Sequence, residues 1–211
     1  MSLEPNKFRK DFPIFNNHKD NFVYFDNAST TQKPKAVIKA INNYYYNYTA
    51  NVHRGAYSIA EKATFKYEES RKIIANFLNA ETNEIIFTKG TTESINFISH
   101  SFAKNKFKKN DEIIITEMEH HSNIIPWQLV CEKTGAKLKY IPINKDGTLN
   151  LSNPDKYFTN KTKVVCIIHQ SNVFGTINPI KDIINIARSV NALVIIDGAQ
   201  SAPHHPINVS E

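Results

Sequence analysis

The residues best suited to chemistry in this chain are Asp197-Gly198-Ala199-Gln200, which directly follow the apolar run 192–196. The run predicts a buried strand, so Asp197 is expected where that strand ends. In open α/β sheets, ligands bind at the carboxyl ends of the strands. A carboxylate there can hold a proton on the ring nitrogen of a pyridine-type cofactor. The simpler alternative is an Asp that caps the following turn.

A second set of suitable residues lies in Thr88-Lys89-Gly90-Thr91-Thr92-Glu93, between a predicted strand and a predicted helix. Amide groups at a helix N-terminus and the helix dipole favour an anion, and the hydroxyls of Thr91 and Thr92 add donors, which together indicate a phosphate site. The segment is neither a Walker A loop nor a GxGxxG fingerprint, which argues against mononucleotide and NAD sites. A plain Thr helix cap is the alternative.

Two further polar segments follow predicted strands. The first, 117–123, contains His120, whose flat imidazole can stack on a heteroaromatic ring. Its neighbour His121 must point elsewhere, which argues against zinc. The second, 169–172, contains Asn172, whose amide can donate to a phenolate oxygen. A capped polar loop and a turn before Gly175 are the structural alternatives.

A phosphate cradle, a stacking ring, a phenolate donor and a pyridinium partner together match pyridoxal 5'-phosphate (PLP). The elements that position them alternate between apolar runs and amphipathic helical patterns. Strands are predicted at 22–25, 84–88, 112–116, 137–141, 164–168 and 192–196. Helices are predicted from Pro34, over 58–78, 92–102 and 124–133, and from Pro179. This alternation predicts an α/β fold with a mainly parallel sheet covered by helices. We expect an N-terminal helical segment over 1–78 and a PLP-binding α/β domain over 79–211.

Composition narrows the class of protein. With 41% hydrophobic residues in 211, the chain can build a core. The net charge of +6 comes from lysines spread along the chain, so we expect no nucleic-acid partner. Two cysteines indicate a reducing compartment rather than a disulfide framework. No signal peptide or membrane-length apolar run is evident, so a cytoplasmic location is expected, with an organelle as the alternative.

The same segments resemble the SufS-type (class II) cysteine desulfurases of aminotransferase class V. The matching strings are FDNASTTQKP at 25–34, NVHRG at 51–55, GTTE at 90–93, EHHSNIIPW at 119–127, SNVFGT at 171–176 and DGAQSAPH at 197–204. The resemblance implies the fold-type I, aspartate-aminotransferase-like fold of PLP-dependent transferases. It also implies a homodimer that works in sulfur metabolism and iron–sulfur cluster assembly.

The resemblance also implies roles for individual residues. Thr91 and Thr92 would hold the cofactor phosphate, and Asp197 would pair with the ring nitrogen. His120 would stack on the ring and take part in proton transfer. Asn172 and Gln200 would face the phenolic oxygen. His53 and Arg54 would lie near the substrate at the dimer interface, with a plain surface cation as the alternative for Arg54.

The family removes sulfur from L-cysteine, giving L-alanine and a persulfide on a catalytic Cys that a SufE- or SufU-like acceptor receives. Its Schiff-base Lys lies in a Ser-Gly-His-Lys string, which these 211 residues do not contain. Neither Cys131 nor Cys166 has the surroundings of the catalytic Cys. We therefore expect a truncated large domain without the small domain, inactive by itself, with apolar surface left exposed.

Other functions share these features. A selenocysteine lyase, a cysteine sulfinate desulfinase or another fold-type I PLP enzyme would show the same constellation. A non-catalytic binding or scaffold fragment is the alternative from a different class.

Overall fold

The computed structural model describes residues 4–18 and 22–211, apart from the side chains of 103–105. It divides into two compact units. One comprises Met1–Ile85 together with Asn208–Glu211, and the other comprises Ile86–Ile207. Each unit is described by itself below.

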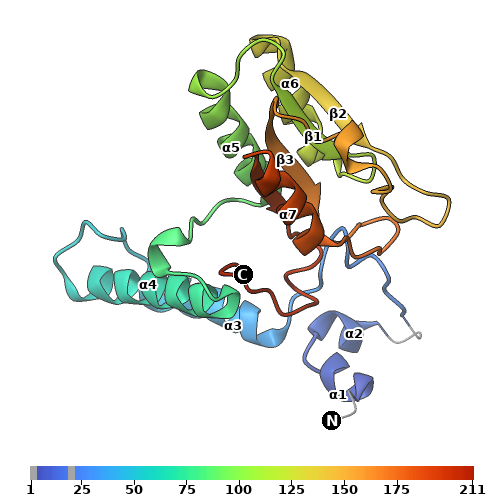
Figure 1. Cartoon of the computed structure of the whole chain (residues 1–211). Coiled ribbons are helices and arrows are strands. Elements are labelled where there is room, and N and C mark those ends of the chain that lie inside the picture. Colours follow the sequence, from blue (N-terminus) through green and yellow to red (C-terminus); the bar gives the residue numbers. More distant parts are fainter. Residues whose placement is uncertain (1–3, 19–21) are drawn as a thin grey trace. The chain divides into compact units, whose positions relative to one another are not determined.

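The second unit is built on a four-stranded sheet (Figure 1). Its strands are β1 (Glu112–Thr116), β2 (Lys137–Ile141), β3 (Thr162–Ile168) and β4 (Leu193–Asp197). They lie in the order β2-β1-β3-β4, and every neighbouring pair is parallel. All four strands were predicted, β1, β3 and β4 from their apolar runs, and the parallel sheet is confirmed.

Helices cover both faces of this sheet. On one face, α5 (Thr91–Asn105) and α6 (Ile125–Thr134) pack against a core cluster, and on the other face α7 (Ile180–Ser189) packs against a second cluster. Successive side chains of a strand point to opposite faces. The strands therefore contribute Ile113, Ile115, Val164 and Cys166 to the first cluster and Ile114, Val165 and Ile167 to the second. Burial on both faces explains why these strands are apolar without alternation.

The first unit is helical. Its elements are α1 (Pro5–Arg9), α2 (Pro13–Asn17), α3 (Lys35–Asn47), α4 (Ser58–Leu78) and the short 3-10 helix η1 (Thr82–Glu84). α4 has the bounds that its periodicity predicts. It ends at Asn79, whose φ of 54° lies in the left-handed region. The end of the chain returns to this point, where Val209 N–H donates to Leu78 O at 3.0 Å.

Two strand predictions were wrong: residues 22–25 and 84–88 form no strand. Their apolar residues are largely exposed, Phe25 by 95% and Ile86 by 70%. An extended apolar segment becomes a strand only when a neighbouring strand takes up its backbone N–H and C=O groups, and in the described residues neither segment has one.

Most large apolar side chains of α3 and α4 are also exposed. α3 contains no buried residue, and α4 buries only Ala60, Ala63 and Ala75. Large apolar side chains such as Tyr46 and Phe65 are 84% and 64% exposed. These two helices therefore carry exposed apolar surface, and whether it lies where further domains would pack stays a prediction.

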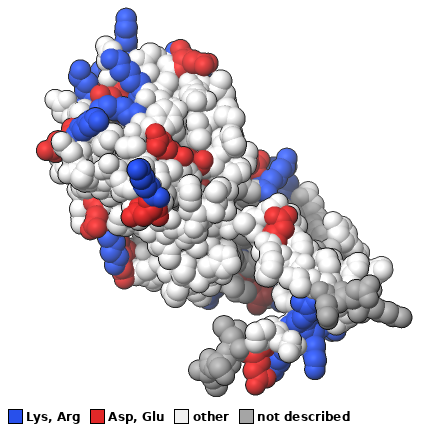
Figure 2. Space-filling model, turned by 90° about the vertical axis from the view of Figure 1, so that its right-hand side faces the viewer, with Lys and Arg blue, Asp and Glu red and all other residues white. Residues whose placement is uncertain are grey.

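Charged side chains are mixed in sign on the face shown in Figure 2, where Lys and Arg stand among Asp and Glu and broad areas carry no charge. Among the described residues, no helix is long and apolar enough to cross a membrane. Within the same residues, no cluster of three or more His, Cys, Asp or Glu side chains could hold a metal ion.

Candidate functional site

Three loops that carry predicted site residues leave the same edge of the sheet. β1, β3 and β4 are adjacent and parallel, so their carboxyl ends lie together. The loop after β3 is attached to the end of β4, because His169 N–H donates to Asp197 O at 2.9 Å. The order of strands therefore brings the segments of His120, Asn172 and Asp197 to one edge, where α/β folds bind ligands.

Asp197 is the last residue of β4 and is only 4% exposed. One of its carboxylate oxygens, Oδ1, accepts the Ala199 N–H at 2.9 Å, which turns the chain immediately after the strand. Gln200 follows in this turn and is half-buried. A buried carboxylate at a strand end favours a cationic partner, so its position fits the protonated ring nitrogen of PLP.

The N-terminus of α5 has the features of an anion site. Gly90 precedes the helix with a φ of 153°, and no side chain caps the helix. Glu93 is turned back to accept the Lys89 N–H at 2.5 Å. The first amides of an α-helix have no partner within the helix, and here Thr91 and Thr92 carry hydroxyls beside them. This donor set fits a phosphate.

α5 also lies where a phosphate would be needed. Its C-terminal end precedes β1, and it packs against the sheet, so the helix runs back along the strands and begins at their carboxyl edge. α5 contacts η2 (His121–Asn123), the 3-10 turn that follows β1.

His120 is exposed and precedes η2. Its ring nitrogen Nδ1 accepts the Ser122 N–H at 3.2 Å and lies 2.8 Å from Ser122 Oγ. Since Nδ1 is used as an acceptor, the neutral ring carries its proton on Nε2. The His121 ring stands at 83° to it, so the two adjacent imidazoles face different directions.

Asn172 lies in a tight loop that two kinds of contact define. Ser171 Oγ accepts the N–H groups of Val173 and Phe174 at 3.2 and 3.1 Å, and Ser171 N–H donates to Thr176 O at 2.9 Å. Gly175 completes the loop with a φ of 72°, which favours glycine. Asn172 is half-buried at a position that this loop holds in place.

The sequence assigned no role in the site to Glu119 and offered Asn123 only as a helix cap, but in the structure both organise this edge. Glu119 is 8% exposed and Asn123 is fully buried. Glu119 Oε1 accepts Thr116 Oγ–H at 2.7 Å and Ile168 N–H at 2.9 Å, and Oε2 accepts Asn123 Nδ2–H at 2.6 Å. The signal that could have revealed them is the four-residue spacing of Glu119, Asn123 and Trp127.

The ionisation of the buried groups follows from their surroundings. Burial raises the pKa of the Glu119 carboxyl to about 7, assisted by the charge of Asp197 and opposed by the three hydrogen bonds. Burial raises the pKa of Cys166 well above its ordinary value and that of Cys131 to about 11. Neither thiol is a thiolate at neutral pH, which agrees with assigning no catalytic role to either.

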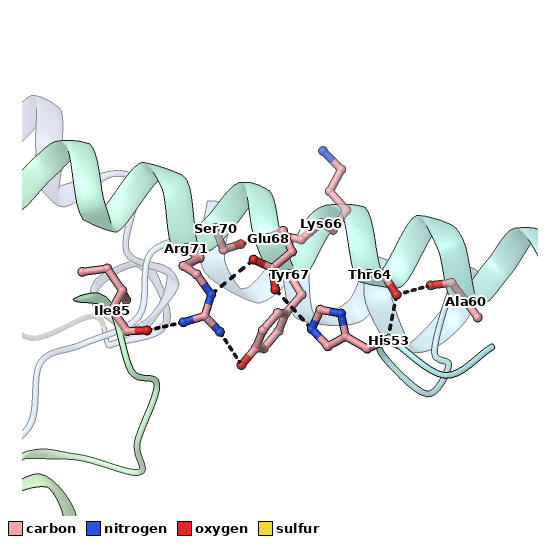
Figure 3. Close-up of polar contacts among 9 residues, drawn as sticks. All are labelled: His53, Ala60, Thr64, Lys66, Tyr67, Glu68, Ser70, Arg71 and Ile85. Carbon is pink, nitrogen blue, oxygen red and sulfur yellow. Dashed lines mark hydrogen bonds and ion pairs between the residues drawn. The ribbon is translucent and has the colours of Figure 1, made fainter. Parts of the chain in front are cut away.

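His53 and Arg54 belong to the first unit, and His53 is held by several contacts there (Figure 3). His53 has a φ of 67°, its N–H donates to Thr64 Oγ1 at 3.0 Å, and its Nε2 lies 3.1 Å from Glu68 Oε1. Arg71 Nε donates to the other oxygen of Glu68 at 3.2 Å, and a second guanidinium nitrogen of Arg71 donates to Ile85 O. Arg54 is exposed.

Comparison with known families gives the decisive match. The family model of the class-V aminotransferases matches residues 23–211. The chain belongs to this family. A probable cysteine desulfurase of Halalkalibacterium halodurans is 48% identical over 212 aligned residues, covering 99% of this chain and 52% of the relative. A probable cysteine desulfurase of Streptomyces coelicolor is also 48% identical, covering 98% and 51%.

A solved structure supports the same assignment. The apo cysteine desulfurase from Thermococcus onnurineus NA1 superposes with a TM-score of 0.92 at 41% identity, covering all of this chain and 51% of that protein. The aspartate-aminotransferase-like α/β fold predicted from the sequence is confirmed, with part of the large domain present. The class-V chain spans about half the length of the curated relatives it matches.

Proposed function

We propose that this class-V protein is a PLP-dependent cysteine desulfurase of the SufS type. The observation that carries the proposal is the convergence of the loops after β1 and β3 with Asp197 at the end of β4, at one edge of the sheet. The resemblance to cysteine desulfurases over nearly the whole chain supports L-cysteine as the substrate.

Each proposed contact follows from the chemistry of the side chain. The buried side chain of Asp197 holds a proton at the cofactor's ring nitrogen. The α5 amides with the hydroxyls of Thr91 and Thr92 bind the phosphate. The amides of Asn172 and Gln200 donate to the phenolic oxygen. PLP, when bound, withdraws electrons from the substrate carbon attached to nitrogen.

His120 has a second task in this proposal. Its Nδ1 is engaged by Ser122, so the ring is held by one edge and offers Nε2–H at the other. An imidazole with one edge fixed can lie against a flat ring and exchange a proton through the free nitrogen. His53 and Arg54 would act at the substrate end, across a homodimer interface.

The sulfur acceptor, the homodimer and a cytoplasmic role in iron–sulfur cluster assembly are parts of this proposal that rest on resemblance to the family. We expect the 211-residue chain alone to bind PLP without turning over L-cysteine. It contains no Ser-Gly-His-Lys string, and its two thiols are protonated at neutral pH.

The experiment is a PLP absorbance titration of the purified chain, comparing Asp197→Asn with Asp155→Asn. Asp155 is exposed in the 3-10 turn η3 (Pro154–Lys156), which makes it a matched control. We expect the wild type and Asp155→Asn to shift the PLP spectrum in the same way, and Asp197→Asn to weaken binding at least about tenfold. Equal binding by all three proteins would contradict the proposal. Sulfide release from L-cysteine, measured in parallel, should be absent.

A further inference from the structure

A buried chain of hydrogen bonds links the ends of β1 and β3. Glu119 and Asn123 form its centre, and we call these two residues the clasp. Glu119 receives Thr116 Oγ–H from β1 and Ile168 N–H from β3. Asn123 Oδ1 accepts Trp127 Nε1–H from α6 at 3.1 Å and Cys166 Sγ–H from β3 at 2.7 Å. The clasp therefore connects two strands with the helix that follows the His120 loop.

The pattern of donors and acceptors fixes the orientation of both side chains of the clasp. Every group aimed at the Glu119 carboxylate is a donor: a hydroxyl, a backbone N–H and the Asn123 amide. Asn123 is oriented in turn, because flipping its amide would turn NH₂ towards the Trp127 and Cys166 donors. A buried polar network of this kind is stable only when every partner is matched.

The clasp surrounds the segment that carries His120. Glu119 precedes His120 directly, and Asn123 is the last residue of η2, whose first turn His120 caps through Ser122. Asp197 lies close enough for its charge to raise the pKa of Glu119. The buried pair thus fixes His120 from both sides and lies next to the proposed ring-nitrogen partner.

We propose that Glu119 is a positioning residue, which acts with Asn123 to hold His120 and the carboxyl ends of β1 and β3 in the geometry that binds PLP. This inference rests on the proposed function. It adds a requirement for two buried side chains that do not touch the cofactor themselves.

The pattern of donors predicts a specific rescue. Glu119→Gln alone puts an NH₂ against the Asn123 NH₂, and Asn123→Asp alone puts a second carboxylate against Glu119. In the double variant, the new amide at position 119 keeps its oxygen towards Thr116 and Ile168 and donates its NH₂ to the new carboxylate at position 123. The other oxygen of that carboxylate then accepts from Trp127 and Cys166. Every hydrogen bond of the wild type has a counterpart in this exchanged pair.

The test measures PLP affinity by absorbance in the full chain for the wild type, both single variants, the double variant and Glu132→Gln. Glu132 is an exposed carboxylate of α6 and serves as the control. We expect each single clasp variant to bind at least about tenfold more weakly, the double variant to recover to within about threefold of wild type, and Glu132→Gln to bind as the wild type does. A double variant no better than the weaker single variant would overturn the proposal.

Hydrogen exchange separates the clasp from the cofactor. Without PLP, the amides of Ile168 and Ser122 should exchange faster in Glu119→Gln and regain protection in the double variant. Unchanged protection in Glu119→Gln would overturn the proposal even if its PLP affinity fell. If the wild-type chain binds no PLP, the proposed function fails, and the exchange result still decides whether the clasp holds the His120 loop.

Discussion

The Cys166 thiol lies 2.7 Å from Asn123 Oδ1 and donates a hydrogen bond to it in the interior of the second unit. Cys166 is fully buried on the sheet face that α5 and α6 cover. The thiol therefore has two structural roles. It fills space in the core, and it donates one of the two hydrogen bonds that the buried Asn123 Oδ1 accepts. Its raised pKa is a consequence of the same burial.

Replacing Cys166 should therefore affect stability far more than replacing Cys131. Cys166→Ala removes a buried side chain and a donor, and we expect a loss of about 1–3 kcal/mol in the free energy of unfolding. Cys131 is half-buried, and Cys131→Ala should cost less than about 1 kcal/mol. Urea unfolding of both variants measures the difference. Equal losses would show that the Cys166 contact with Asn123 contributes nothing.

Both thiols should also react slowly with a thiol reagent in the folded chain at about pH 7.5. Burial raises the pKa of Cys131 to about 11 and that of Cys166 further, so each has little thiolate at this pH. Labelling with a chromogenic disulfide should become fast for both only in denaturant. A thiol that reacts rapidly in the native chain would contradict this expectation and reopen the question of a reactive cysteine.

Glu119 should make the stability of the chain fall as the pH rises from about 4.5 to about 7. The pKa of this carboxyl is raised from 4.5 to about 7, so the folded state binds its proton more tightly than the unfolded state does. Its contribution is complete below pH 4.5 and is lost as the pH passes 7. The slope is about 1.4 kcal/mol per pH unit within this window, or about 3 kcal/mol in total.

The measurement is the free energy of unfolding by urea at several pH values for the wild type and Glu119→Gln. His169 acts in the opposite direction, since burial and His205 lower its pKa, and the variant retains this effect. The difference between the two proteins therefore isolates Glu119. Parallel pH profiles would show that the carboxyl titrates near its ordinary value.

Strands β1, β3 and β4 could be predicted because each carries a continuous apolar run, which is typical of strands covered on both faces. Their position at the strand ends makes Asp197 and the His120 segment candidate site residues, and their roles stay predictions. The clasp could not be predicted in this way. Whether Glu119 points to solvent or into the core depends on Ile168, a residue 49 positions away in sequence that the sheet brings beside it.

Residues 22–25 and 84–88 were predicted as strands from their composition but form none. Their composition favours strands, but a strand depends on a partner, and composition says nothing about whether one is adjacent. The division of the chain near residue 79 and the roles of His53 and Arg54 stay predictions.

Gly55→Ala should destabilise the first unit, because the loop before α4 has no room for a methyl group. A Cβ at Gly55 would lie 2.4 Å from Ala60 Cβ and 2.8 Å from the Tyr57 ring. Ala60 is fully buried and cannot move as a flexible side chain could. We expect a loss of about 1–3 kcal/mol. Gly198→Ala is the control, since its Cβ would lie an ordinary 3.6 Å from Ser201 Oγ. Thermal unfolding should show a clearly lower melting temperature for Gly55→Ala than for Gly198→Ala.

Thr64→Val should loosen His53 while leaving α4 intact. Thr64 Oγ1 accepts the His53 N–H at 3.0 Å and itself donates to Ala60 O at 2.8 Å. Only the first bond fixes the left-handed backbone of His53, whose φ of 67° is costly for a residue other than glycine. Valine has the same shape without the hydroxyl, so the His53 amide should exchange at least about tenfold faster while far-UV circular dichroism stays unchanged. Thr64→Ser, which keeps the hydroxyl, should behave as the wild type, and faster exchange in the serine variant as well would show that Thr64 holds His53 by packing rather than by this hydrogen bond.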